Sequence, residues 1–376
     1  MKPIHVLYDG QVFAQQIYGG VSRIFYELIT RLSANPETRI SLFHGLYINR
    51  YPLEEIKDKC AFYYGKEVLA FPHISVLLKP LNNFLFRRHI AGKAVDIYHP
   101  TNYSSLVSRW KKSPVVLTVN DMIPELFPHT YTDIRRRLKI KKECIRRADM
   151  IIVISRQTGE DLLNFYNVSR DKVRVIYPGA PVPPRKGEKI RRFPHPRPYI
   201  LYVGTRKQGY KNFYGFFSGF TASSKLVNRF DIICFGGGYL KRKELRYLSG
   251  CGCGLEMHLF QPPGDEELLP MLYRGAAALV YPSLYEGFGL PPLEAMTYGC
   301  PVIAGHVSAI PEVLGDAAAY FDPYRLETLT AVMETVLFNP VLKKYLSQKG
   351  REQVKLYSWE KMATETLRLY REITGN

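Results

Sequence analysis

Two glutamates, Glu286 and Glu294, stand eight positions apart in a segment whose pattern places them at the edge of a sheet. The apolar run 277–281 predicts a buried strand, and Pro291–Pro292 predict the first turn of a helix that Gly299 ends. Ligands of parallel α/β sheets bind beyond the carboxyl ends of the strands. The loop between this strand and this helix is therefore predicted to line a binding site.

The residues of this loop predict a site for a nucleotide-diphosphate sugar without a metal. Gly287 and Gly289 let backbone amides approach a ligand, and the helix start behind them offers N–H groups to phosphate. Glu294, expected in the first helical turn, could accept hydrogen bonds from the ribose diol, and Glu286 from hydroxyls of a transferred sugar. Alone, each glutamate could be a helix-terminal charge or a solvated loop residue, but the whole arrangement favours the site. The expected donor-binding loop comprises Gly287, Phe288, Gly289 and Leu290.

The segment 285–296, YEGFGLPPLEAM, resembles the corresponding motif of family 4 of the retaining GT-B glycosyltransferases, also described as glycosyl transferases group 1. The resemblance extends over nearly the whole chain. It implies an α/β fold of two doubly wound, Rossmann-like domains facing a central cleft, with a C-terminal helix that crosses back to the N-terminal domain. It also implies that Glu294 holds the ribose and Glu286 the donor sugar of a hexosyltransferase.

A second segment, 203–213, resembles the family's strand-end loop, in which an arginine and a lysine hold the donor diphosphate. By position these are Arg206 and Lys211, after Gly204 at the strand end. Fixed cations stabilise a departing diphosphate more in the transition state than in the ground state. The alternative is an exposed basic loop. Many family members have arginine directly before the lysine, whereas this chain has Tyr210 and a loop one residue longer.

Further resemblances lie in the N-terminal half. Gly19 and Gly20 match the family's glycine loop, which faces donor and acceptor, and Asn120 precedes Asp121 where the family often has His-Asp. Asparagine can bond a sugar hydroxyl but cannot carry a proton as histidine does. This favours a retaining, same-face reaction in which the donor diphosphate takes the acceptor's proton. His99, at another expected strand end, either borders the acceptor cleft beside Asp121 or is structural.

Short apolar runs alternate with helical periodicity along the chain, which predicts parallel sheets with crossover helices. The proline-rich segment 180–198 predicts an interdomain linker, with a boundary near Lys186. The N-terminal, acceptor-side domain is expected over 1–186 together with a last helix within 358–376, and the nucleotide-sugar domain over 187–357. Strands are expected at 4–9, 40–46, 95–99, 115–120, 150–155, 173–177, 199–204, 230–235, 257–260, 277–281 and 301–304.

Composition constrains the class of protein. The chain of 376 residues has no signal-peptide pattern and no apolar run near the roughly 20 residues that span a bilayer, so a cytoplasmic location is expected. Six scattered cysteines indicate reduced thiols. Cys251 and Cys253 lack a second ligand pair at zinc-site spacing, so a loop is the better interpretation. No cofactor is expected beyond the nucleotide sugar as co-substrate.

A formal net charge of +18 predicts an anionic partner, which charge alone does not identify. Residues 135–147 hold eight basic residues and one acid, with Ile134, Leu138 and Ile145 spaced along one helix face, and 84–90 interleaves apolar and basic residues. One interpretation is a solvated helix whose other face is core. The other is reversible docking on the anionic inner face of the cytoplasmic membrane, from which the acceptor is presented.

Other functions remain alternatives. The charge and 27 tyrosines fit a nucleic-acid-binding protein, but no RNP-like motif or zinc finger is present, so nucleic acid is not an expected partner. A nucleotide-sugar epimerase or a phosphorylase could share the scaffold. Gly236–Gly238 follow an expected strand without the GxGxxG of dehydrogenases. The donor is expected to be GDP-mannose, with UDP- and dTDP-sugars open. The acceptor is expected to be a glycan or lipid-linked saccharide of polysaccharide or lipopolysaccharide assembly.

Overall fold

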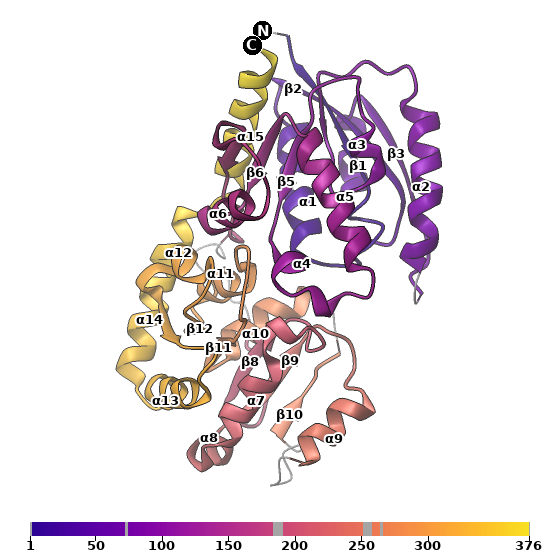
Figure 1. The fold of residues 1–376 in the computed structure, drawn as a ribbon. Coiled ribbons are helices and arrows are strands. Elements are labelled where there is room, and N and C mark those ends of the chain that lie inside the picture. Colours follow the sequence, from indigo (N-terminus) through magenta and orange to yellow (C-terminus); the bar gives the residue numbers. More distant parts are fainter. Residues whose placement is uncertain (1, 72–73, 183–190, 251–257, 264–265, 376) are drawn as a thin grey trace. The chain divides into compact units, whose positions relative to one another are not determined.

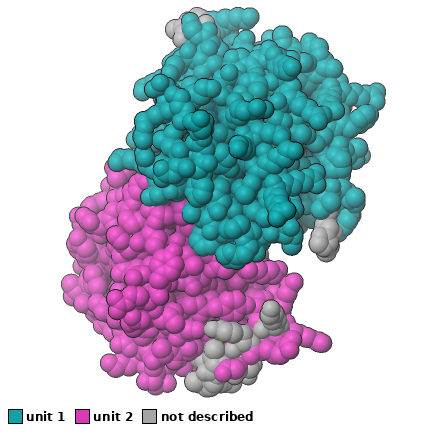
Figure 2. All heavy atoms as spheres, viewed as in Figure 1, with its two compact units in different colours: residues 1–179, 359–376 teal, residues 180–358 magenta. Residues whose placement is uncertain are grey.

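The computed structural model describes residues 2–71, 74–182, 191–250, 258–263 and 266–375. The chain divides into unit 1, Met1–Gly179 with Trp359–Asn376, and unit 2, Ala180–Ser358, which Figure 2 colours separately. The boundary predicted near Lys186 lies outside the described residues, as do Cys251 and Cys253.

Unit 1 is built on parallel strands with helices as the crossovers (Figure 1). One sheet has the order β3-β2-β1-β4 and a second the order β5-β6-β7, and a parallel bridge between Tyr98 and Val115 joins them. The combined order is that of a doubly wound sheet. The strands are β1 (Ile4–Asp9), β2 (Thr38–Tyr47), β3 (Phe62–Glu67), β4 (Ile97–His99), β5 (Val116–Val119), β6 (Met150–Val153) and β7 (Val173–Val175).

The helices of unit 1 cover this sheet and bury one face each. In the first of them the spacing of Ile24, Phe25, Leu28 and Leu32 produces a continuous apolar stripe, and all four are buried. The helices are α1 (Gly20–Ser33), α2 (Ile74–Ile90), α3 (Ser105–Ser108), α4 (Ile123–Leu126), α5 (Ile134–Arg147), α6 (Arg156–Phe165) and α15 (Trp359–Thr374). Short 3-10 turns are η1 (Leu53–Lys59), η2 (Pro128–Thr130) and η3 (Arg170–Lys172).

The last helix, α15, returns to unit 1, as predicted. Its Tyr370 hydroxyl lies 2.6 Å from that of Tyr8 on β1. Trp359 is buried against Gly179, so closely that a side chain at position 179 would collide with it. Arg174 on β7 pairs with Glu372. The C-terminal residues are thus part of the core of the first unit.

Unit 2 holds one parallel sheet with the order β10-β9-β8-β11-β12-β13, the order of a Rossmann fold. Its strands are β8 (Tyr199–Val203), β9 (Asp231–Phe235), β10 (Leu259–Phe260), β11 (Ala278–Tyr281), β12 (Val302–Gly305) and β13 (Ala318–Phe321). Its helices are α7 (Phe213–Thr221), α8 (Ser224–Arg229), α9 (Arg242–Gly250), α10 (Leu269–Gly275), α11 (Leu290–Thr297), α12 (Ile310–Leu314), α13 (Leu326–Leu337) and α14 (Pro340–Gln353). Its 3-10 turns are η4 (Gly209–Lys211), η6 (Glu266–Leu268), η7 (Gly315–Ala317) and η8 (Val354–Leu356).

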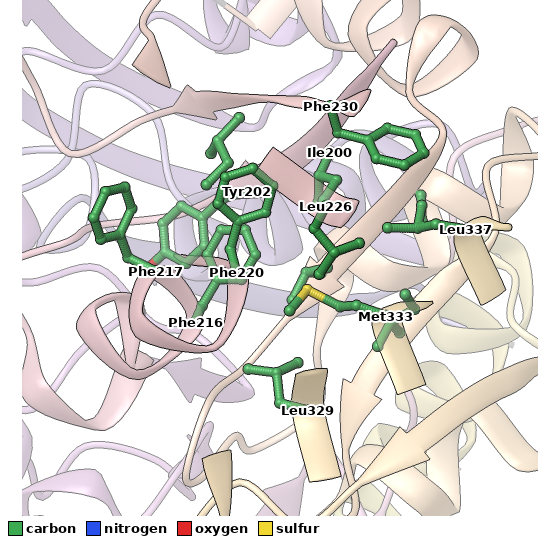
Figure 3. Close-up of a cluster of buried hydrophobic side chains, with 14 of the residues drawn as sticks. Ile200, Tyr202, Phe216, Phe217, Phe220, Leu226, Phe230, Leu329, Met333 and Leu337 are labelled. Atoms are coloured by element: carbon green, nitrogen blue, oxygen red, sulfur yellow. The ribbon is translucent and has the colours of Figure 1, made fainter. Parts of the chain in front are cut away.

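The core of unit 2 fixes strand β8, whose end carries part of the site. Phe216 and Phe220 of α7 lie in one buried cluster with Ile200 and Tyr202 of β8 and Met333 of α13 (Figure 3). The aromatic spacing along α7 places these rings on the sheet side of the helix. The strand end is therefore held by a rigid layer.

The expected strands are found, most of them shortened by one or two residues, and residue 257 of one lies outside the described part. Strands β3 and β13 were not predicted. The sequence of β3, FYYGKE, places a glycine and two charges in a partly exposed edge strand, and β13, AAYF, is too short and alanine-rich to show a strand period. Among the described helices, none has the length and apolar character to span a membrane.

Candidate functional site

The candidate site of unit 2 lies at the carboxyl ends of three neighbouring strands, β8, β11 and β12. All three are parallel, so the loops that follow them share one edge of the sheet. The loop after β11 is tied to the loop after β8 by a hydrogen bond of 2.7 Å from the Leu284 amide to the Tyr210 carbonyl. The loops after β8 and β11 are thus bonded directly to each other.

Glu286 is the side chain on which these loops converge. Its Oε1 accepts a hydrogen bond of 2.6 Å from Lys211 Nζ and another of 2.6 Å from Ser283 Oγ. Its backbone amide donates to Ser308 Oγ at 2.9 Å, from the loop after β12. The glutamate is 7% exposed, so its carboxylate is fixed in direction and largely withdrawn from water.

A tyrosine lies beneath this ion pair. Lys211 Nζ is 5.6 Å from the ring centre of Tyr281, the last residue of β11. Burial first, and then the charge of Glu286 beside it, hold the pKa of the Tyr281 hydroxyl well above its usual range. The phenol therefore stays protonated and donates rather than adding a second negative charge.

Helix α11 places the second glutamate. Gly289 precedes the helix in a left-handed conformation (φ 98°). Prolines occupy the first turn and Gly299 follows the helix end at φ 73°, both as predicted. Because α11 begins at Leu290, Glu294 is its fifth residue and lies just beyond the first turn, which corrects the prediction. Its Oε2 accepts a hydrogen bond of 2.8 Å from Tyr273 on α10. Glu294 is thus oriented by a buried neighbour.

Arg206 does not join the Lys211–Glu286 pair. Its side chain is fully buried, its Nε donates to Glu244 at 2.9 Å, and its two terminal nitrogens donate to the carbonyls of Gly236 and Gly238. The predicted contact of Arg206 with the donor diphosphate stays a prediction, and in this structure its bonds go to protein groups instead. The sequence pattern indicated a cation at a strand end, but it gave no sign that the buried Glu244 would pair with it.

The other donor-side residues lie where the sequence places them. Gly204 follows β8 at φ 145°, a backbone conformation that L side chains rarely adopt. Phe288 is buried edge-on against Tyr357 at 5.5 Å, and Leu290 is buried as the first residue of α11. Gly287 lies between Glu286 and Phe288 in the same loop. These residues shape the loop, and their contact with a donor remains a prediction.

In unit 1, the glycine loop and the Asn-Asp segment also follow strand ends. Gly19 caps α1, and Gly20 is its first residue. A side chain at Gly19 would meet the amide of Gln16.

Asn120 follows β5, and its buried Oδ1 has no hydrogen-bond partner within the described residues. Asp121 accepts from the Ile123 amide at 3.0 Å. The Asn120 carbonyl is available as an acceptor, and its contact with a sugar hydroxyl stays a prediction.

His99 lies in the interior of unit 1. Its Nδ1 lies 2.5 Å from the Tyr370 hydroxyl and its Nε2 2.8 Å from the Thr118 hydroxyl, and the residue is fully buried. Burial lowers its pKa to about 3, so the imidazole is neutral. Of the two roles left open by the sequence, the structure supports the structural one.

Several residues of the site were missed by the sequence argument. Ser308 lies in the loop after β12, and its place behind an expected strand was a usable sequence signal. In the structure its φ is 49°, a value that is rare outside glycine. Ser283 was equally close to the motif. Tyr273 and Glu244 come from helices with no local signal. Their contacts depend on tertiary structure.

Together these groups can act on a sugar phosphate. A fixed carboxylate accepts from sugar hydroxyls, an ammonium beside it stabilises a departing diphosphate, and Glu294 can accept from a diol. Within the described residues, no group of three or more His, Cys, Asp or Glu side chains is placed to hold a metal ion. The metal-free donor site remains a prediction.

Comparison with known families and proteins matches both units. The family described as Glycosyl transferases group 1 matches residues 185–353, and the family described as Glycosyltransferase Family 4 matches residues 18–182. O-antigen chain mannosyltransferase B of Escherichia coli is 29% identical over 94% of this chain and 96% of its own length. O-antigen chain mannosyltransferase RfbU of Salmonella typhimurium is 29% identical over 55% of this chain and 56% of its own.

Solved structures share the fold. Sucrose-phosphate synthase from Thermosynechococcus elongatus superimposes with a TM-score of 0.75 at 20% identity, with both chains fully covered. WaaG, a glycosyltransferase involved in lipopolysaccharide biosynthesis, gives a TM-score of 0.73 at 16% identity, covering 99% of this chain and 100% of its own. The α/β fold with two Rossmann-like domains is therefore that of the GT-B glycosyltransferases.

Proposed function

The chain belongs to glycosyltransferase family 4, the glycosyl transferases group 1, and from that premise we propose that it is a retaining hexosyltransferase acting on a nucleotide-diphosphate sugar. Mannose, carried by GDP, is the first candidate for the transferred sugar. The acceptor is a glycan or lipid-linked saccharide of O-antigen or related polysaccharide assembly. The names of the two O-antigen mannosyltransferases that resemble the chain support mannose as the sugar and O-antigen assembly as the process.

The observation that carries the proposal is the convergence of Lys211 and Ser283 on Glu286 at the ends of β8 and β11. An ammonium and a carboxylate held 2.6 Å apart present a cation for phosphate and an acceptor for sugar hydroxyls at one point. In a nucleotide-diphosphate sugar the diphosphate and the sugar are joined by one bond, so the diphosphate can lie at Lys211 while the sugar hydroxyls lie at Glu286. Glu294, oriented by Tyr273, then accepts from the ribose hydroxyls.

The proposed reaction exchanges one bond to the anomeric carbon. The bond from this carbon to the diphosphate oxygen breaks, and a bond to the acceptor's hydroxyl oxygen forms on the same face of the sugar. The hydroxyl proton passes to the departing diphosphate oxygen, so no side-chain base is needed. Lys211 stabilises the charge that develops on the diphosphate, and this stabilisation is greater in the transition state than in the bound donor.

The test begins with a thermal-shift panel of GDP, UDP, dTDP and their sugars, because a ligand that binds only the folded protein raises its Tm. The nucleotide sugar that binds is then supplied with and without a saccharide acceptor. Formation of a glycoside with the donor's anomeric configuration, measured by NMR coupling constants, supports the proposal. Sugar conversion without an acceptor indicates an epimerase instead, and binding of nucleic acid with no nucleotide-sugar binding indicates the nucleic-acid alternative.

We further propose that unit 1 docks on an anionic membrane, through α2 rather than through the apolar face predicted for α5. In α5, Ile145 is buried, Ile134 and Leu138 are half-buried, and Lys141 pairs internally with Glu125 at 2.9 Å. The residues of α5 that are fully exposed are therefore basic. The α2 sequence exposes Leu77, Leu81 and Phe84 at 63%, 45% and 62%. An apolar stripe of this kind on an isolated helix face indicates an interaction surface.

The charges around α2 favour an anionic lipid as the partner. Residues 74–90 contain no acid, and Arg87 and Arg88 are exposed at the end of the stripe. Arg136 and Arg137, at the start of α5, lie close enough to help lower the pKa of Lys79, after the larger effect of burial. Apolar insertion combined with basic residues is the pattern of reversible interfacial binding. Co-sedimentation with anionic and zwitterionic vesicles tests the proposal.

A further inference from the structure

Arg206 is an arginine enclosed within unit 2 at the end of β8. It is 1% exposed, and three of its five N–H donors are taken by fixed protein acceptors. Nε donates to Glu244 Oε1 at 2.9 Å, and the two terminal nitrogens donate to the Gly236 carbonyl at 2.9 Å and the Gly238 carbonyl at 2.6 Å. A phosphate could reach the guanidinium only after these contacts moved.

The carbonyls that Arg206 holds belong to three consecutive left-handed glycines. Gly236, Gly237 and Gly238 follow β9 at φ 89°, 76° and 71°. A Cβ at Gly237 would lie 3.1 Å from Thr205 Cα and 3.2 Å from the Arg206 amide, so the glycine turn packs directly on the loop after β8. Glycines adopt left-handed backbone without steric cost but are also the most flexible residues, so a turn of three glycines needs outside contacts to keep one conformation. Arg206 supplies that restraint.

Glu244 completes the arrangement from α9. It is 5% exposed and lies in the first turn of the helix, where its second oxygen accepts from the Lys241 amide at 2.9 Å. The Arg206–Glu244 pair therefore joins the end of β8, the turn after β9 and the start of α9. Removing either partner leaves a buried charge without its counterion, which is more disruptive than loss of an exposed pair.

We infer that Arg206 and Glu244 are positioning residues that hold the turn 236–238 in the conformation needed for nucleotide binding. We also infer that Arg206 does not contact the donor diphosphate. The inference rests on the proposed function only for its ligand measurements. It separates the two cations of the strand-end loop, because the partly exposed Lys211 bonds Glu286 whereas Arg206 is enclosed by Glu244 and two backbone carbonyls.

The experiment compares Arg206→Lys, Glu244→Gln and Gly237→Ala with the control Arg246→Lys, an exposed arginine on α9. Affinities for GDP and GMP, or for UDP and UMP if the panel selects uridine, are measured by calorimetry. A positioning role predicts that all three variants weaken both nucleotides by similar factors, of about tenfold. Backbone hydrogen exchange at 236–240 should accelerate in the same variants and not in the control.

Direct contact with the diphosphate predicts a different pattern. Arg206→Lys would then weaken the diphosphate several-fold more than the monophosphate, while Glu244→Gln would leave both affinities unchanged, and this result would overturn the inference. Exchange at 236–240 that is unaltered in Glu244→Gln would also overturn it. Absence of nucleotide binding in the wild type would contradict the proposed function, whereas the exchange measurement would still test the Arg206–Glu244 pair. If Arg206→Lys fails to fold, Glu244→Gln and Gly237→Ala decide the question.

Discussion

Lys211 Nζ lies 2.6 Å from Glu286 Oε1, although the two side chains come from loops that follow different strands. The pair is only partly shielded, with 18% of the lysine side chain and 9% of the glutamate side chain exposed. An ion pair that water can reach adds little to stability, and its charges can exchange partners with a charged ligand. A role of this pair in binding the donor is therefore a prediction that substitution can test.

The first prediction concerns Lys211. Replacement by methionine should lower kcat on the order of a hundredfold with a smaller change in donor KM, because the cation acts chiefly on charge that develops as the diphosphate departs. The measurement is steady-state transfer with the donor found in the nucleotide panel. Lys225→Met, an exposed lysine on α8, is the matched control. Turnover by Lys211→Met within threefold of wild type would remove this role.

The second prediction concerns Glu294 and the ribose. Glu294→Ala should weaken GDP binding by about ten- to a hundredfold, because a diol loses its charged acceptor. The wild type should lose a similar factor for 2′,3′-dideoxy-GDP, whereas the variant should bind the two nucleotides alike. Tyr273→Phe, which removes the hydrogen bond from Tyr273 to the Glu294 carboxylate, should weaken GDP binding a few-fold. If uridine is the base selected, the UDP pair replaces the GDP pair in the same design.

Equal losses for the dideoxy nucleotide in the wild type and in Glu294→Ala would contradict the assignment, because two groups that contact one another cannot have independent effects. Calorimetric affinities of both nucleotides with both proteins are sufficient for this cycle. Thermal denaturation of the variants without ligand separates binding from folding.

The motif around Glu286 predicted the fold of its surroundings closely because its signals are local. Proline in the first turn, glycine after the helix end and an apolar run before the loop each restrict the backbone on their own. They correctly placed β11, the loop and α11. Only the helix start differed, which moved Glu294 to the fifth position.

The partners of side chains were less predictable. Nothing in the local sequence distinguishes Lys211, which bonds Glu286 across two strands, from Arg206, which is enclosed by Glu244. The difference is made by a helix some forty residues later in the chain. Likewise, the burial of His99 depends on Tyr370, which arrives only with the C-terminal helix. Long-range contacts of this kind have no signature in residue spacing.

A third prediction follows from two buried histidines. Burial lowers the pKa of His44 and of His99 to about 3, from an ordinary value of 6.5. The unfolded chain therefore binds more protons than the folded one between pH 6.5 and 3, and stability falls as the pH falls through that window. At pH 5 the loss is about 2 kcal/mol for each histidine. Asp9 opposes the trend, since burial raises its pKa and the folded state holds its proton more tightly.

The measurement is the free energy of unfolding in urea from pH 7 to pH 4.5. His44→Phe, whose ring can retain the stacking on Tyr47 at 3.6 Å, should flatten the pH dependence by close to one proton. The exposed His129→Phe is the control and should keep the wild-type slope. A His44→Phe slope equal to that of the wild type would show that this histidine is not the source of the acid sensitivity.

The last prediction tests the apolar stripe of α2 against vesicles. Phe84→Gln and Leu77→Gln should each lower binding to vesicles containing phosphatidylglycerol about tenfold, because each removes an apolar side chain from the interface. Val341→Gln, which alters a residue 78% exposed on α14, is the matched control. Wild-type binding should fall with rising salt and be weak on zwitterionic vesicles, since Arg87 and Arg88 act on the anionic surface. If vesicle binding is unaffected by both α2 variants but lost in Arg136→Gln, then α5 and not α2 contacts the membrane. Vesicle binding that does not change with salt would show that Arg87 and Arg88 do not act on the anionic lipid.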